Sequence, residues 1–159
     1  MPLHHYHINT VWTGNLGDGT KAYQAYERSH VIRIEGKPDI QGSSDAAFRG
    51  DKTKHTPEDL FVSTLSTCHM LWYLHLCAKQ GVIITDYVDK ALGVMEELAD
   101  GSGRFTAVTL HPEVTVTAHH MIDKAKELHH EAHKMCFIAN SVNFPVAHEP
   151  VIRTAEKVA

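Results

Sequence analysis

The sequence predicts an α+β protein. The segments near the amino end alternate apolar and polar residues as strands do, the stretch from Leu60 to Ala78 contains no Asp, Glu, Lys or Arg, and a later segment repeats apolar residues at helical spacing. Strand-like segments therefore surround a helix that is apolar on all sides, as buried helices are. The length of 159 residues, 43% of them apolar, suits one core. We expect residues 1–159 to form a single domain.

The first third of the chain predicts a β-hairpin. His4 to Trp12 and Tyr23 to Glu35 are rich in alternating, β-branched or aromatic residues, and the turn-forming segment Gly14 to Gly19 lies between them. The segment Lys37 to His55 is polar and rich in glycine and serine. We expect it to be a long loop, a kind of segment that often carries function.

A long helix is predicted over roughly residues 57–80. Thr56 suits the N-cap, Pro57 suits the first helical position, and the two carboxylates that follow suit the positive end of the helix dipole. Gly81 marks the end of the helix. The uncharged stretch contains several Ser, Thr and His residues, which are costly against lipid. A helix buried inside the protein is therefore favoured over a membrane span.

The second half predicts a hairpin, a helix and a last strand. Val82 to Leu98 and Arg104 to Ala118 are expected to be two strands joined by a Gly-rich turn. Met121 to Ala139 repeats apolar residues every three or four positions, which predicts an amphipathic helix with Cys136 on its buried side. Phe144 to Arg153 is expected to close the sheet. The order of elements indicates an α+β domain.

Composition argues against several classes of function. The 15 basic and 19 acidic residues give a net charge of −4, and no basic run is long enough to follow a phosphate backbone, so we expect no nucleic-acid partner. Met1 to Thr10 carries three histidines where a signal peptide needs an apolar segment. We therefore expect a cytoplasmic protein, no membrane partner, and three cysteines that serve packing, metal binding or redox chemistry.

The cysteines of the long helix are not equivalent. Cys68 and Cys77 point in opposite directions on a helix and cannot form a disulfide with each other. Cys77 is expected to be a small core residue. Cys68 shares its face with Phe61, Leu71 and Trp72, and such apolar surroundings raise the pKa of a thiol. A reactive Cys68 therefore needs a cation beside it, and without one it is a structural residue.

Two features resemble the OsmC/Ohr family of thiol peroxidases. The sequence Thr56-Pro57-Glu58-Asp59-Leu60 and the following Cys68-His69-Met70 are similar to the family's Asn-Pro-Glu-Glu-Leu pattern and helical cysteine, and Cys136 matches a second cysteine late in the chain. The loop from Gly42 to Asp51 is also similar. The resemblance implies an OsmC-like fold, with antiparallel sheets wrapped around long central helices in an intertwined homodimer.

The resemblance also implies an activity. It is the reduction of organic hydroperoxides, with Cys68 as the peroxidatic and Cys136 as the resolving cysteine, followed by reduction by an external dithiol. Arg49, or alternatively Arg28, would activate Cys68, and Glu58 would orient the arginine. We expect no cofactor and no metal.

Helical geometry adds two expectations to this scheme. Phe61, Leu71 and Trp72 would form the apolar wall of the substrate pocket. Glu58 and Cys68 on one straight helix are about 15 Å apart along its axis. We therefore expect Glu58 and its arginine to serve Cys68 of the partner subunit.

Other functions remain open on the sequence. His129, His133 and Cys136 have the spacing to hold zinc or copper from one helix, although a solvated polar face is the alternative. His75 could tune the pocket or be a packed residue bonded to the backbone. The runner-up function is a non-catalytic protein that binds metal or a small apolar ligand, and a third is another electrophile-directed thiol chemistry.

Overall fold

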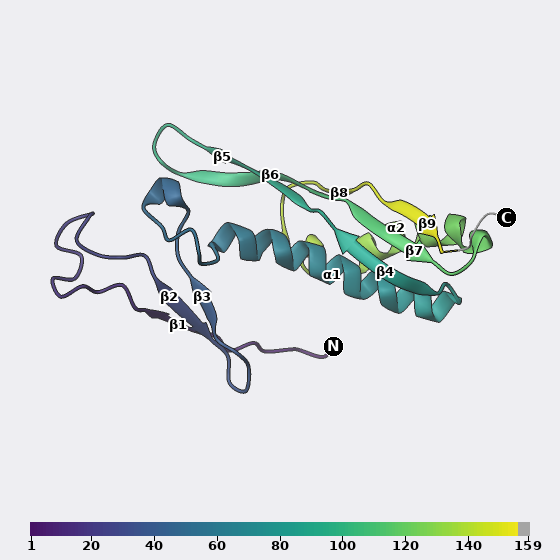
Figure 1. Cartoon of the computed structure of the whole chain (residues 1–159), viewed down its shortest axis with the longest axis horizontal. Helices are drawn as coiled ribbons and strands as arrows, with labels where there is room; N and C mark the ends of the chain where they lie inside the picture. The colour runs from purple at the N-terminus through teal and green to yellow at the C-terminus, as the bar shows by residue number, and fades with distance from the viewer. Residues whose placement is uncertain (156–159) are drawn as a thin grey trace. The chain divides into compact units, whose positions relative to one another are not determined.

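The computed structural model describes residues 1–155, and these divide into two compact units after Leu60. Figure 1 shows the order of the elements along the chain. Each unit is described by itself. The expectation of one domain over residues 1–159 stays a prediction, and residues 156–159 lie outside the described part.

The first unit contains a three-stranded antiparallel sheet in the order β1-β2-β3. The predicted hairpin is present as β1 (Asn9–Trp12) and β2 (His30–Arg33), with both strands shorter than expected. The predicted loop 37–55 holds a third strand, β3 (Ile40–Gly42), and a short 3-10 helix, η1 (Ala46–Phe48). A strand of three residues is too short to show an alternating pattern, which explains why the sequence did not indicate it.

The long helix α1 spans Pro57–Gln80, as predicted. Its start is a reciprocal cap in which the Asp59 N–H donates to Thr56 Oγ1 at 3.1 Å and the Thr56 N–H donates to Asp59 Oδ2 at 3.0 Å. The helix ends at Gly81, whose φ of +74° is rarely adopted by residues that carry a side chain. Among the described helices, none combines the length and the apolar character that crossing a bilayer requires.

The predicted second hairpin is divided between two sheets. β4 (Ile84–Asp89) pairs with β7 (Pro112–Val116), and β5 (Leu92–Glu97) pairs with β6 (Gly103–Leu110), both antiparallel. At the division, Asp89 Oδ1 accepts a hydrogen bond from the His111 N–H at 2.7 Å, and Pro112 has no N–H to continue the ladder. These local contacts replace strand pairing and separate the sheets.

The last strand is also divided, into β8 (Val146–His148) and β9 (Val151–Thr154). β8 pairs with β6 and β9 with β7, both parallel, so the sheets of the second unit have the orders β5-β6-β8 and β4-β7-β9. The expectation of purely antiparallel sheets is therefore wrong for this unit. Pro150 lies between the two strands, where the chain changes sheet.

The second helix, α2, spans Ile122–Met135 and is preceded by η2 (His119–Met121) and followed by η3 (Ala139–Ser141). It ends earlier than predicted because Cys136 is extended, with a ψ of 111°. Helices α1 and α2 share a core with β7. This core contains Tyr73 and Cys77 from α1, Val114 and Val116 from β7, and Ala125, Leu128 and Ala132 from α2.

Candidate active site

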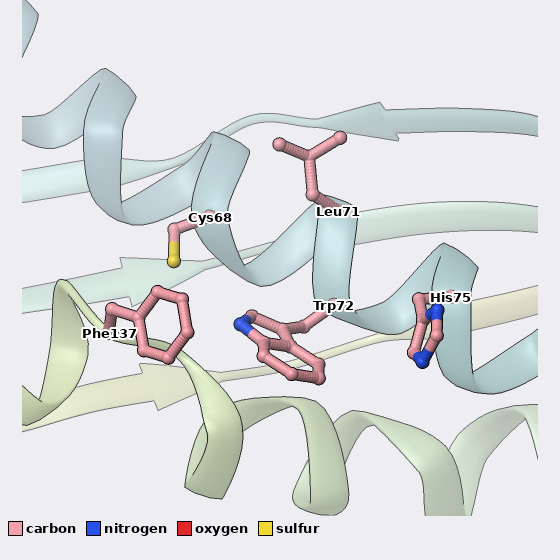
Figure 2. Close-up of a pocket in the computed structure, with 5 residues that line it drawn as sticks. All are labelled: Cys68, Leu71, Trp72, His75 and Phe137. Atoms are coloured by element: carbon pink, nitrogen blue, oxygen red, sulfur yellow. The ribbon is translucent and has the colours of Figure 1, made fainter. Parts of the chain in front are cut away.

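Cys68 lies on one wall of an apolar cavity of about 310 Å³ in the second unit. The other lining residues are Leu71, Trp72 and His75 from α1 and Phe137 from the segment after α2. Figure 2 shows these five side chains, with the Cys68 sulfur on the side of α1 that faces Phe137 and Trp72. Because Cys68 is half-buried, a ligand in the cavity can reach its sulfur.

Cys136 lies next to Cys68. It is fully buried at the carboxyl end of α2, where its Sγ accepts a hydrogen bond from the Ala139 N–H at 3.4 Å. Burial and, second, a hydrogen bond with the Cys68 side chain raise the pKa of Cys136 to about 11. The structure therefore brings the two sequence-predicted thiols into contact. Both are free, as is Cys77.

Two of the three predicted pocket residues line the cavity, and the third does not. Leu71 and Trp72 are in its wall. Phe61 instead packs in a second core cluster, with its ring 4.9 Å from that of Phe105 and 5.9 Å from that of Phe144. Phe61 lies two helical turns before Cys68, so it shares the face but not the depth along the axis. The wall also contains His75, which the sequence analysis considered as a residue that could tune the pocket, and Phe137, which it did not assign.

The indole of Trp72 is held between two other rings. It meets Phe137 edge to face at 5.6 Å and 86°, and His75 at 5.7 Å and 90°. His75 is exposed rather than packed against the backbone, so the expectation of a packed histidine is wrong. The three rings fix the orientation of the wall opposite the sulfur.

Cys77 is a core residue, as predicted. It is buried among Tyr73 and the residues of β7 and α2, and burial raises the pKa of its thiol to about 11. It does not line the cavity at Cys68. The chain therefore has one thiol with no role in the site, which is useful as an internal control.

A buried pair of histidines connects α1 and α2 behind the cavity. His69 Nε2 and His129 Nδ1 are 2.9 Å apart, and the two rings are nearly parallel. Burial lowers the pKa of His69 to about 4 and that of His129 to about 3. His129 also stacks on Tyr73 at 3.8 Å. The expectation of a solvated polar face is therefore wrong for His129.

The histidines around this pair do not form a metal centre as they stand. Within residues 1–155, no group of three or more His, Cys, Asp or Glu is placed to hold a metal ion. The set His129, His133 and Cys136 is divided, because Cys136 faces Cys68 while His129 faces His69. Instead of sharing a metal ion, His129 of α2 and Cys136, which directly follows α2, make two different contacts with α1.

The two candidate arginines line one polar cavity of about 220 Å³ in the first unit, together with Glu27 and Asp51. Arg28 donates to the carbonyls of Tyr26 at 2.6 Å and Tyr23 at 2.7 Å, and its guanidinium lies over both rings. Arg28 therefore has a structural role that occupies its donors.

Arg49 differs from Arg28 in two respects. It is exposed, and within the described part of the chain its guanidinium has no hydrogen-bond or ion-pair partner. It is also the one residue other than glycine in residues 1–155 with a positive φ, 63°, a conformation that costs energy and is found at functional sites. Glu58 lies in the first turn of α1, also in the first unit. The roles of Arg49 and Glu58 toward Cys68 stay predictions.

Comparison with known proteins identifies similar sequences and structures. The model of the OsmC-like protein family matches residues 50–150. A solved OsmC-like protein of unknown function from Vibrio cholerae is 30% identical, with a TM-score of 0.84 over 94% of this chain and 100% of that one. No curated protein matches the chain.

Two further solved structures share the fold at lower identity. An organic hydroperoxide resistance protein from Elizabethkingia anophelis is 16% identical, with a TM-score of 0.65 over 95% of this chain and 98% of that one. The organic hydroperoxide resistance protein OhrB of Bacillus subtilis is 19% identical, with a TM-score of 0.63 over 96% and 100%.

Proposed function

Because the chain belongs to the OsmC-like protein family, we propose that it reduces organic hydroperoxides, with Cys68 as the peroxidatic and Cys136 as the resolving cysteine. The observation that carries the proposal is the contact between these two thiols at the edge of an apolar cavity. Two structural neighbours are organic hydroperoxide resistance proteins, which is consistent with this activity.

The proposed reaction has three steps. The Cys68 thiolate attacks the terminal oxygen of the hydroperoxide, the O–O bond breaks, and Cys68 becomes a sulfenic acid while an alkoxide leaves and is protonated to the alcohol. The Cys136 thiol then condenses with the sulfenic acid, forming a disulfide and releasing water. An external dithiol reduces the disulfide and restores both thiols, which suits a reducing compartment such as the cytoplasm.

The contact between the thiols supports this division of roles. Cys68 lines the cavity and Cys136 is fully buried behind it, so a peroxide in the cavity meets Cys68 first. Cys136 is held protonated by burial and by its hydrogen bond with Cys68, which keeps it from competing as the first nucleophile. After Cys68 is oxidised, its partner thiol is already adjacent.

We propose that the activating cation is a guanidinium from outside the cavity wall. None of the lining residues is Lys or Arg. We propose Arg49, oriented by Glu58, in a homodimer in which these residues serve Cys68 of the partner subunit. Several apolar side chains are exposed in the single chain, among them Leu71 at 63% and Val94 at 47%, and a second copy would cover them.

Counting free thiols tests the proposed function. Wild-type protein treated with cumene hydroperoxide should lose two of its three free thiols per chain, and Cys77→Ser should also lose two. Cys136→Ser should lose one and accumulate a sulfenic acid at Cys68. If Cys68 reacts no faster than free cysteine, the peroxidase proposal is wrong. Occupation of the cavity without thiol loss would then favour an apolar-ligand-binding protein.

Mixing two inactive variants tests the arrangement across the dimer. Arg49→Gln keeps Cys68, and Cys68→Ser keeps Arg49. If Arg49 acts on the partner subunit, mixed dimers contain one complete site and recover activity with cumene hydroperoxide. If mixing restores nothing, Arg49 acts within its own chain or not at all.

A further inference from the structure

The proposed reaction leaves a charge that the two cysteines do not stabilise. When the thiolate attacks, negative charge moves from sulfur to the departing alkoxide oxygen. In an apolar cavity this charge is costly unless a fixed donor faces it. Efficient reaction therefore requires a hydrogen-bond donor in the cavity wall near the sulfur.

Trp72 carries such a donor. Trp72 is four positions after Cys68 on α1, so the two side chains lie on the same face of the helix, one turn apart. Figure 2 shows the Trp72 indole with its nitrogen on the side of Cys68 and Phe137 and its six-membered ring toward His75. The indole N–H is thus at the end of the cavity that holds the sulfur.

This N–H has no acceptor within residues 1–155. Trp72 is half-buried, and its indole makes two perpendicular ring contacts, with Phe137 and with His75. Indole N–H groups that are taken from water usually find a partner. The other tryptophan of the chain follows this rule, because Trp12 Nε1 donates to the Glu27 carbonyl at 2.8 Å.

The same ring contacts limit the motion of the indole. Phe137 and His75 meet it from two sides, each nearly perpendicular to its plane. A donor that is held in place before the reaction needs little reorganisation as charge develops, and this is the condition under which a hydrogen bond lowers a barrier most.

We propose that Trp72 is a further catalytic residue, whose indole N–H donates a hydrogen bond to the alkoxide oxygen that leaves when Cys68 attacks the peroxide. The inference rests on the proposed function. The indole keeps its proton throughout: the S–O bond forms, the O–O bond breaks, the alkoxide accepts the hydrogen bond from Nε1, and water entering the open cavity then protonates it to the alcohol.

Changing the leaving group tests this role. Trp72→Phe keeps an aromatic wall and removes the N–H, and Trp12→Phe is the matched control that removes an indole N–H from the first unit. The rate of Cys68 oxidation is measured with tert-butyl hydroperoxide, whose leaving alkoxide is strongly basic, and with peracetic acid, whose leaving carboxylate is weakly basic and needs little stabilisation.

We expect Trp72→Phe to slow the reaction with tert-butyl hydroperoxide by about 10- to 100-fold. The rate with peracetic acid should change by less than about threefold, because the leaving carboxylate is less basic and needs less stabilisation from a hydrogen bond. Trp12→Phe should change neither rate. An equal loss with both oxidants would show that Trp72 fills space, and no loss with either would show that its N–H is idle. Both results overturn the inference while leaving the peroxidase intact. A wild-type Cys68 that reacts with neither oxidant overturns the proposed function and this inference with it.

Discussion

Lowering the pH should destabilise the fold through the histidine pair of α1 and α2. His69 and His129 are buried and uncharged, with pKa values of about 4 and about 3. In the unfolded chain each imidazole has its ordinary pKa of about 6.5. As the pH falls from 7 to 5, the unfolded chain therefore binds protons that the folded protein does not. The stability is present above pH 6.5 and is lost as the pH falls toward 4.

The size of the effect follows from the two pKa values. At pH 5 an unfolded imidazole is almost wholly protonated, whereas both buried imidazoles are almost wholly neutral. This difference lowers the free energy of unfolding by roughly 2 kcal/mol for each histidine between pH 7 and pH 5, and by about 4 kcal/mol for the pair. His148 packs against both rings, and burial also lowers its pKa. Its titration therefore acts in the same direction. His130 and His133 lie against His148 on its other sides.

Urea unfolding at pH 7 and pH 5 measures this loss. The wild type is compared with the double variant His69→Leu, His129→Leu, which removes the pair, and with His120→Gln, which removes an exposed histidine of the same unit. Between pH 7 and pH 5, the decrease in the free energy of unfolding should be about 4 kcal/mol smaller for the double variant than for the wild type. For His120→Gln the decrease should equal that of the wild type. Protein concentration is held constant, because association also shifts stability. If the double variant and the wild type lose equal stability, the buried pair is not neutral in the folded state and the reasoning fails.

Three further predictions follow from single contacts. Gly93→Ala should lower the free energy of unfolding by about 1–3 kcal/mol, measured by urea unfolding. The reason is that the new Cβ would lie 2.5 Å from Val62 Cγ2 and 2.9 Å from Phe105 Cε1. An unchanged midpoint of urea unfolding would show that α1 and β5 are less closely packed. Phe137→Ala should slow Cys68 oxidation by cumene hydroperoxide about tenfold more than it slows oxidation by hydrogen peroxide, since Phe137 supplies apolar wall. An equal loss of rate with the two peroxides would remove Phe137 from substrate selection. Arg49→Gly should stabilise the fold by about 1 kcal/mol, because its φ is 63°, yet slow Cys68 oxidation about tenfold or more; a stabilised and fully active variant would exclude Arg49 from the reaction.

The parts of the fold that sequence reasoning predicted correctly are those with local signals. The approximate bounds predicted for α1 agree with the structure, because Thr56, Pro57 and Gly81 act on the backbone within one turn. The division of the predicted strands was missed, because it depends on a contact between Asp89 and His111 that are far apart in the sequence. A periodic pattern shows that a strand exists and does not show which partner it takes.

The candidate site divides in the same way. Cys68, Leu71 and Trp72 were assigned to one face by helical geometry, and the structure places them around one cavity. Phe137 could not be found in this way, because α2 ends before it and its position depends on the extended backbone at Cys136. His129 was misjudged because the pattern of α2 marks it as polar and therefore exposed. In the structure it is buried, and its Nδ1 forms a hydrogen bond with His69 on another helix. Pairs of polar residues that satisfy each other across a core leave no signal in one segment.

The absence of lysine and arginine on two sides of α1 has a structural explanation that also bears on mechanism. One side of α1 is inside the core through Leu65, Tyr73 and Cys77, and another lines the cavity at Cys68, so a lysine or arginine on either side would be desolvated at a cost of several kcal/mol. Neither of these two sides of α1 carries a lysine or arginine beside Cys68. In the proposed reaction we therefore expect another segment, from the same chain or from a second copy, to supply the guanidinium that activates Cys68.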